Sequence, residues 1–126
     1  MFKESKRLKE WAAWEAAYSS ELFGVEVRRM IDRLRLELAL DDTGVAQAHE
    51  ALQKMEASVG RILLSPAILH RASLPMPTAV KTLDALHLAS AHLFQERREQ
   101  TLIFATHDRQ QGLAAKAFGF RVIGAE

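Results

Sequence analysis

A ten-residue stretch, from Thr82 to Ala91, constrains the fold of this chain more than any other part of the sequence. It is apolar on nearly every side, which is typical of a helix enclosed by protein. One acid, Asp84, lies in what would be the first turn of that helix. A carboxylate in such surroundings is costly unless a cation, a metal ion or backbone donors compensate its charge. Taken alone, Asp84 is best explained as an acid that the helix dipole favours.

The composition is that of an ordinary globular protein, and we expect residues 1–126 to form a single domain. Hydrophobic residues make up 48% of the chain and charged residues 26%. The formal net charge of +1 excludes a strongly basic coat, so any polyanion must bind to a local patch. The chain contains no cysteine, which excludes disulfides and thiolate metal sites. Because no signal peptide and no membrane-spanning run is found, we expect a cytoplasmic protein without a membrane segment.

Helical and strand patterns alternate along the chain. Apolar spacing predicts helices over residues 3–17, 21–40, 45–59 and 66–72. A central helix should start between residues 78 and 82 and continue to about residue 96, and a last helix should follow Asp108 and end at Phe118. Short apolar runs predict strands over residues 17–19, 62–64, 102–105 and 120–123. Residues 41–44 carry a turn signal, and Ser20, Ser65 and Asp108 are suited to cap the helices that follow them. Such alternation predicts an α/β fold with a parallel sheet and right-handed crossovers.

Three acids fall where this fold would direct them to one crevice. Ligands of open parallel sheets bind beyond the carboxyl ends of the strands. Asp108 directly follows a predicted strand, Glu26 lies in the first turns of a helix after another, and Asp84 begins the central helix. Each acid also has a purely structural explanation: Asp108 as a helix cap, Asp84 as a dipole partner, and Glu26 as an edge residue that reaches solvent.

Carboxylates gathered in this way would repel one another unless a cation binds between them. Mg²⁺ and similar hard ions prefer oxygen ligands, and they can activate water and neutralise charge on a phosphoryl group. The acids therefore suggest hydrolysis of a phosphodiester. His87 and His107 neighbour two of them, but no zinc-type spacing is present, and structural roles are favoured for both.

The segment Leu83-Asp84-Ala85-Leu86-His87-Leu88-Ala89 resembles the third-acid motif of PIN-domain ribonucleases, especially the VapC-type toxins of bacterial toxin–antitoxin pairs. The segment Ser19-Ser20-Glu21-Leu22, with Glu26 and Arg29, is similar to the part that bears their second acid. Thr106-His107-Asp108, followed by Gly119-Phe120-Arg121-Val122, resembles the part that carries their fourth. The resemblance extends from about Ser5 to Ile123.

This resemblance implies a three-layer α/β/α domain with the activity of a Mg²⁺- or Mn²⁺-dependent endoribonuclease. Glu26, Asp84 and Asp108 would be its catalytic, metal-binding acids. The substrate would be RNA, and the further partners would be a cognate antitoxin and a second copy in a homodimer. The RNA target and the identity of the antitoxin do not follow from the sequence.

One part of the family pattern has no counterpart. Family members begin with a hydrophobic strand that ends in a first acid, whereas this sequence opens directly in the following helix, and Glu4, Glu10 and Glu15 lack the strand context. We therefore expect a fold that is incomplete at its amino end, with weak or absent metal binding and little nuclease activity. One alternative is a non-catalytic interaction module on the same scaffold, which would use the Trp11 and Trp14 helix and the hairpin of residues 21–59 to bind itself or an antitoxin. Another is a small binding domain whose acids are only caps and surface charges.

Overall fold

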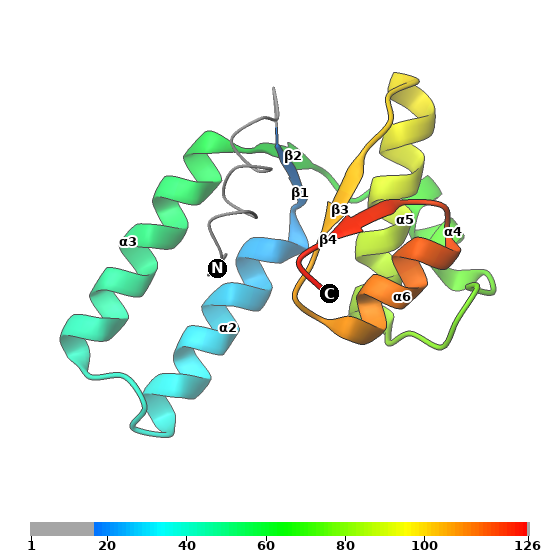
Figure 1. Ribbon diagram of the computed structural model, residues 1–126. Helices are drawn as coiled ribbons and strands as arrows, with labels where there is room; N and C mark the ends of the chain where they lie inside the picture. Colours follow the sequence, from blue (N-terminus) through cyan, green and yellow to red (C-terminus); the bar gives the residue numbers. More distant parts are fainter. Residues whose placement is uncertain (1–16, 126) are drawn as a thin grey trace. The chain divides into compact units, whose positions relative to one another are not determined.

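The structure, a computed structural model, describes residues 17–125, which fall into two compact units. We call residues 17–63 the hairpin unit and residues 64–125 the core unit (Figure 1). Both units combine helices with one pair of short parallel strands, which confirms the mixed α/β class and the parallel pairing. The helix expected over residues 3–17, with Trp11 and Trp14, falls outside the described residues. No helix described between residues 17 and 125 is both long and apolar enough to cross a lipid bilayer.

The hairpin unit consists of two helices and two strands. Its elements are β1 (Tyr18–Ser20), α2 (Leu22–Leu36), α3 (Asp42–Ser58) and β2 (Gly60–Ile62). The helices α2 and α3 lie side by side as the expected hairpin (Figure 1). β1 and β2 pair in parallel, with Tyr18 opposite Gly60 and Ser20 opposite Ile62.

The connection between α2 and α3 differs from the prediction. α2 ends at Leu36 rather than at Leu40, because Leu38 takes a left-handed conformation with φ of 60°. Residues 41–44 do not form a separate turn. Instead, Asp41 caps α3, and its Oδ1 accepts a hydrogen bond from the backbone N–H of Gly44 at 2.7 Å.

The second strand begins two residues earlier than its apolar residues suggest. The sequence predicts a strand over residues 62–64, whereas β2 starts at Gly60, and Leu63 is 62% exposed. A side chain at position 60 would collide with the ring of Tyr18. The strand pair is therefore closed by a glycine that lets an aromatic ring approach the backbone.

A two-pronged ion pair links α2 to α3. The guanidinium of Arg28 donates two hydrogen bonds to the carboxylate of Glu56, at 2.7 and 3.0 Å. This hydrogen bonding and the charge of Arg28 lower the pKa of Glu56, and the charge of Arg61 adds to the effect. The two side chains cross the helix at Gly24, where a Cβ would displace both of them.

Replacing Glu56 by Gln should make the stability of the protein less sensitive to acid. The folded-state pKa of Glu56 lies below its ordinary value of 4.5, so its stabilisation is present above that value and is lost as the pH falls through the folded pKa. Thermal unfolding at a series of acidic pH values measures how steeply the stability falls with pH. Glu50→Gln, on the same helix, is the control for removing one carboxylate. Equal slopes for the two variants would contradict the prediction.

The core unit contains the remaining helices and strands. Its elements are α4 (Pro66–Ser73), α5 (Thr82–Arg98), β3 (Ile103–Ala105), α6 (Arg109–Ala117) and β4 (Arg121–Ile123). The predicted start of α4 is confirmed, because Ser65 Oγ accepts from the backbone N–H of Ile68 at 3.2 Å and Pro66 is the first helical residue. β3 and β4 pair in parallel, and Gly119, with φ of 102°, ends α6 as expected.

The predicted central helix provides the core of this unit. Leu88, on α5, is fully buried and packs in one cluster with Ala114, Ala115 and Phe120. The neighbouring Ser90 is also buried, and its hydroxyl donates to the carbonyl of Leu86 at 2.7 Å, which satisfies it within the helix. The small side chains of Ala114 and Ala115 on α6 thus form part of the enclosure of Leu88.

Replacing Leu88 by Ala should lower the free energy of unfolding by about 2–5 kcal/mol, because it leaves a cavity in a site that is fully enclosed. Chemical denaturation followed by circular dichroism measures this loss. Leu83→Ala, on the same helix but 46% exposed, is the matched control and should cost much less. Similar losses for both variants would show that Leu88 is not the centre of the core.

Candidate functional site

Asp108 lies just beyond the carboxyl end of β3, as predicted, and caps α6. Its Oδ1 accepts from the backbone N–H groups of Gln110 and Gln111, at 2.9 and 3.1 Å. The hydroxyl of Thr106 accepts from the backbone N–H of Asp108 and donates to the buried Gln111 side chain at 2.7 Å. The other carboxylate oxygen, Oδ2, takes no hydrogen bond from the described residues. Capping therefore occupies one oxygen and leaves a second for a ligand.

The end of β4 also closes on this junction. The backbone N–H of Thr106 donates to the carbonyl of Ile123 at 3.0 Å. Gly124 follows with φ of 98°, and a Cβ there would collide with the carbonyl of Thr106. The carboxyl ends of both parallel strands thus meet beside Asp108, which is the edge where ligands of such sheets collect.

A single hydrogen bond links the loop that precedes α5 to the start of α6. The side-chain amide of Gln110 donates to the carbonyl of Ala79 at 2.9 Å. Gln110 follows Asp108 by two residues, and Ala79 precedes the first turn of α5, which holds the half-buried Asp84. Two of the three predicted acids therefore come from segments that are tied together.

The third acid, Glu26, belongs to the hairpin unit. It is half-buried on α2, and helical spacing places Arg29 and Arg33 on the same face, three and seven residues further along. Glu26 thus shares a helix face with two exposed cations. The catalytic role of Glu26, Asp84 and Asp108 stays a prediction.

Neither unit contains, among its described residues, a group of three His, Cys, Asp or Glu side chains that could hold a metal ion. A site built from Glu26, Asp84 and Asp108 would need residues of both units. The donor chemistry nevertheless fits a hard divalent cation, since all three are carboxylates, and Mg²⁺ typically takes one or two of these beside several waters.

Other candidate residues have structural surroundings. His87 is half-buried on α5 and His107 is exposed. Arg28, Arg29 and Arg33 are exposed cations of α2 and thus candidate phosphate contacts, but Arg28 is bound to Glu56. Sequence reasoning missed this pair, although an antiparallel hairpin brings the amino-terminal half of α2 opposite the carboxyl-terminal half of α3.

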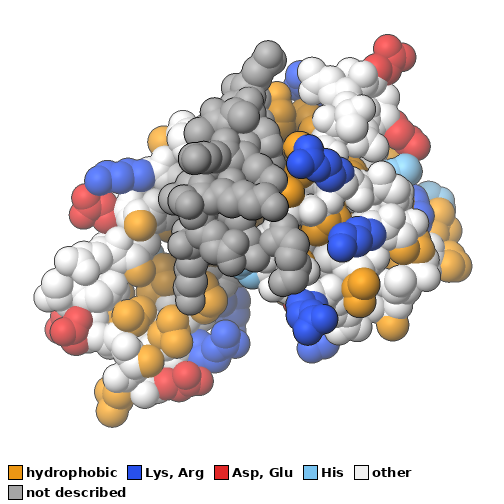
Figure 2. Space-filling view, viewed as in Figure 1, with side chains coloured by type: hydrophobic (Ala, Val, Ile, Leu, Met, Phe, Trp, Pro, Cys, Tyr) orange, Lys and Arg blue, Asp and Glu red, His pale blue; other side chains and the backbone are white. Residues whose placement is uncertain are grey.

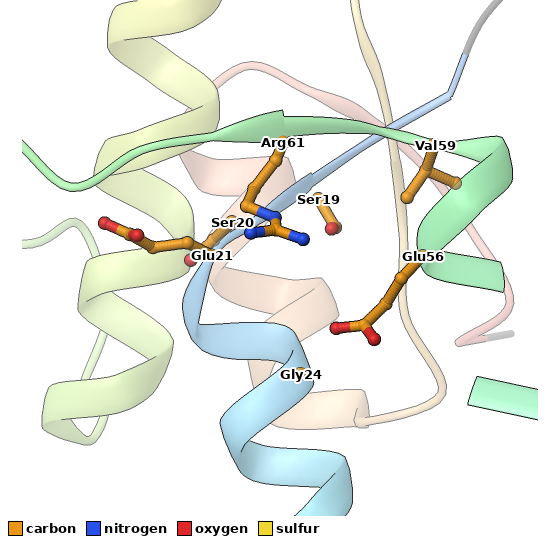
Figure 3. A pocket seen from close by; sticks show the side chains of 7 residues that line it. All are labelled: Ser19, Ser20, Glu21, Gly24, Glu56, Val59 and Arg61. Carbon is orange, nitrogen blue, oxygen red and sulfur yellow. The ribbon is translucent and has the colours of Figure 1, made fainter. Parts of the chain in front are cut away.

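The hairpin unit also has a shallow hollow beside the start of α2. It measures about 220 Å³, opens to solvent, and is lined by Ser19, Ser20, Glu21, Gly24, Glu56, Val59 and Arg61. Figure 3 shows Arg61 and Glu56 reaching toward it from the two ends of the segment around β2, whereas Glu21 points away. Charges of both signs line the hollow, and Glu56 is already held by Arg28. We therefore interpret the hollow as a structural feature of the hairpin unit and not as a ligand site.

Comparisons with protein-family models, with curated proteins and with solved structures find no match for this chain. The assignment of a function therefore depends on the residues described above.

The capping and ligand roles of Asp108 can be separated by substitution. Asn caps helices as well as Asp, so Asp108→Asn should leave stability nearly unchanged, whereas Asp108→Ala should cost about 1 kcal/mol. Chemical denaturation measures both. Asp41→Ala, which removes the cap of α3, is the matched control and should cost a similar amount. A large loss for Asp108→Asn would show that the charge of Asp108 itself supports the fold.

Proposed function

We propose that this protein is a metal-dependent endoribonuclease with a three-layer PIN-type domain. The observation that carries this proposal is the bond between Gln110 and Ala79, because it ties the segment leading to Asp84 to the helix that Asp108 caps. Carboxylates supply the oxygen ligands that Mg²⁺ prefers, and a metal ion held by them can activate water for hydrolysis of a phosphodiester. Hydrolysis of RNA in the cytoplasm, under control of an antitoxin, follows from the resemblance.

The proposed mechanism gives each acid a part in holding one cation. Asp84 and Asp108 would hold it together with Glu26. A bound Mg²⁺ or Mn²⁺ supplies activation of water and neutralises charge on the phosphoryl group. Arg29 and Arg33, on the face of Glu26, contact the neighbouring phosphates of the RNA strand.

A second candidate is a non-catalytic interaction module that binds an antitoxin or another copy of the chain. The hairpin unit favours it, because Val25, Leu36 and Leu38 are 55%, 66% and 90% exposed. Exposed apolar side chains on a helical hairpin are typical of a protein-binding surface. This function needs neither a metal ion nor RNA, so the two candidates differ in their requirements.

Cleavage of a labelled single-stranded RNA, assayed with Mn²⁺ and with EDTA, tests the enzyme. Glu26→Gln, Asp84→Asn and Asp108→Asn should each lower the metal-dependent rate by about 100-fold or more. All three substitutions conserve shape, and Asn keeps the cap of α6. A version with an added first strand, as in the family that the sequence resembles, extends the range of the assay.

Asp32→Asn is the control, because Asp32 is exposed on α2 and pairs with Arg35 inside the same helix. It should cleave at the parental rate. Cleavage that persists in EDTA, or that survives all three substitutions, would exclude the metal-dependent mechanism. An absence of cleavage, together with self-association that Leu38→Glu abolishes in sedimentation experiments, would favour the interaction module.

A further inference from the structure

The carboxyl-terminal part of the core unit has an unusual distribution of charge. From Arg109 to Ala125 the chain contains Arg109, Lys116 and Arg121 but no Asp or Glu, although the whole chain carries a net charge of only +1. All three cations are exposed. In the view of Figure 2, Lys and Arg side chains stand out over α6 and β4, without acidic ones among them. This part of the surface is therefore a local positive patch in a nearly neutral protein.

Helical geometry places two of these cations on one face of α6. Arg109 and Lys116 are seven residues apart, which is about two turns and roughly 10 Å along the helix axis. Leu113 lies between them on the same face and is 62% exposed. The opposite face of α6, with Ala114 and Ala115, is buried in the core. The packing of the helix thus forces its two cations toward solvent.

The described contacts do not neutralise these two charges. In the hairpin unit, by contrast, three exposed cations pair with acids on their own or a neighbouring helix: Arg28 with Glu56, Arg35 with Asp32, and Lys54 with Glu50. Neither Arg109 nor Lys116 has an ion pair within residues 17–125. A pair of cations fixed to a rigid helix without acidic partners suits a ligand that supplies its own negative charges.

We propose that the exposed face of α6, with Arg109 and Lys116, binds the phosphate backbone of single-stranded RNA. This inference rests on the proposed ribonuclease function and adds a second surface to its substrate-binding site. An acidic protein is the less suitable ligand, because Leu113 is the only large apolar side chain exposed on α6, and protein interfaces need an apolar centre. Contacts to phosphate position the strand without reading its sequence.

Fluorescence anisotropy with a labelled single-stranded RNA of mixed sequence tests this surface on the full chain. EDTA is present throughout, so that binding is measured without cleavage. The variant Arg109→Gln/Lys116→Gln is compared with Arg35→Gln/Lys54→Gln, which removes the same number of charges from two exposed helix positions that are already paired. Each exposed contact contributes a factor of roughly 1.5 to 5, so the α6 variant should bind roughly 2- to 25-fold more weakly.

The salt dependence gives a second readout. Each phosphate contact on a single strand contributes about −0.7 to the slope of log K against log salt, so the α6 variant should have a slope smaller by about 1.4. The control variant should keep both the affinity and the slope of the parent. Equal losses in the two variants would indicate general charge attraction, and unchanged binding in both would place the RNA elsewhere. Either result overturns the proposal, as does equally tight binding of poly-glutamate.

This experiment and the cleavage assay fail in different ways. RNA binding that depends on α6, in a chain that never cleaves RNA, would retain the surface and refute the enzyme. Metal-dependent cleavage, with an affinity for RNA that the α6 substitutions leave unchanged, would retain the enzyme and refute the surface.

Discussion

The carboxylate of Asp108 is the constraint on which the candidate site depends. An acid at a helix N-cap normally has a structural role, and here Oδ1 fills that role by accepting from two backbone N–H groups. The hydroxyl of Thr106 fixes the preceding backbone, so the direction of the carboxylate is set by the loop. The same bonds that start α6 therefore hold Oδ2 at the carboxyl end of β3. Capping and ligand binding are compatible because they use different oxygens.

Local signals predicted most of the secondary structure. The start of β2 was mispredicted because it depends on contact with a residue that is distant in the sequence. Ser65 and Pro66 begin α4 as expected, since a cap depends only on its own helix. The start of β2 could not be predicted in this way. β2 begins at Gly60 because this residue pairs with Tyr18, which is distant in the sequence. The missed cap of α3 is an exception, because Asp41 bonds to Gly44 within its own helix, and there the turn signal of residues 41–44 was misleading.

The candidate site shows the same division between local and distant information. The places of Glu26, Asp84 and Asp108 on their elements could be predicted, because each depends on the position of one helix start. The link between the segment before α5 and the start of α6 could not, because it depends on one amide, that of Gln110, which reaches the carbonyl of Ala79. The pairing of Arg28 with Glu56 likewise requires the register of the hairpin, and it removes one cation from the set of candidate phosphate contacts.

The two proposals for the core unit share one helix. α6 carries the capping acid at its amino end and the cations Arg109 and Lys116 along its exposed face. A polyanion that lies along this face would approach Asp108, where a free strand of phosphates would be repelled unless a cation neutralised the carboxylate. The positive face and the acid at its end thus favour the same ligand only when a divalent ion is present. Under the two proposals, attraction along the helix would bring the strand to the acid, and a bound metal ion would decide whether a phosphate can enter the site.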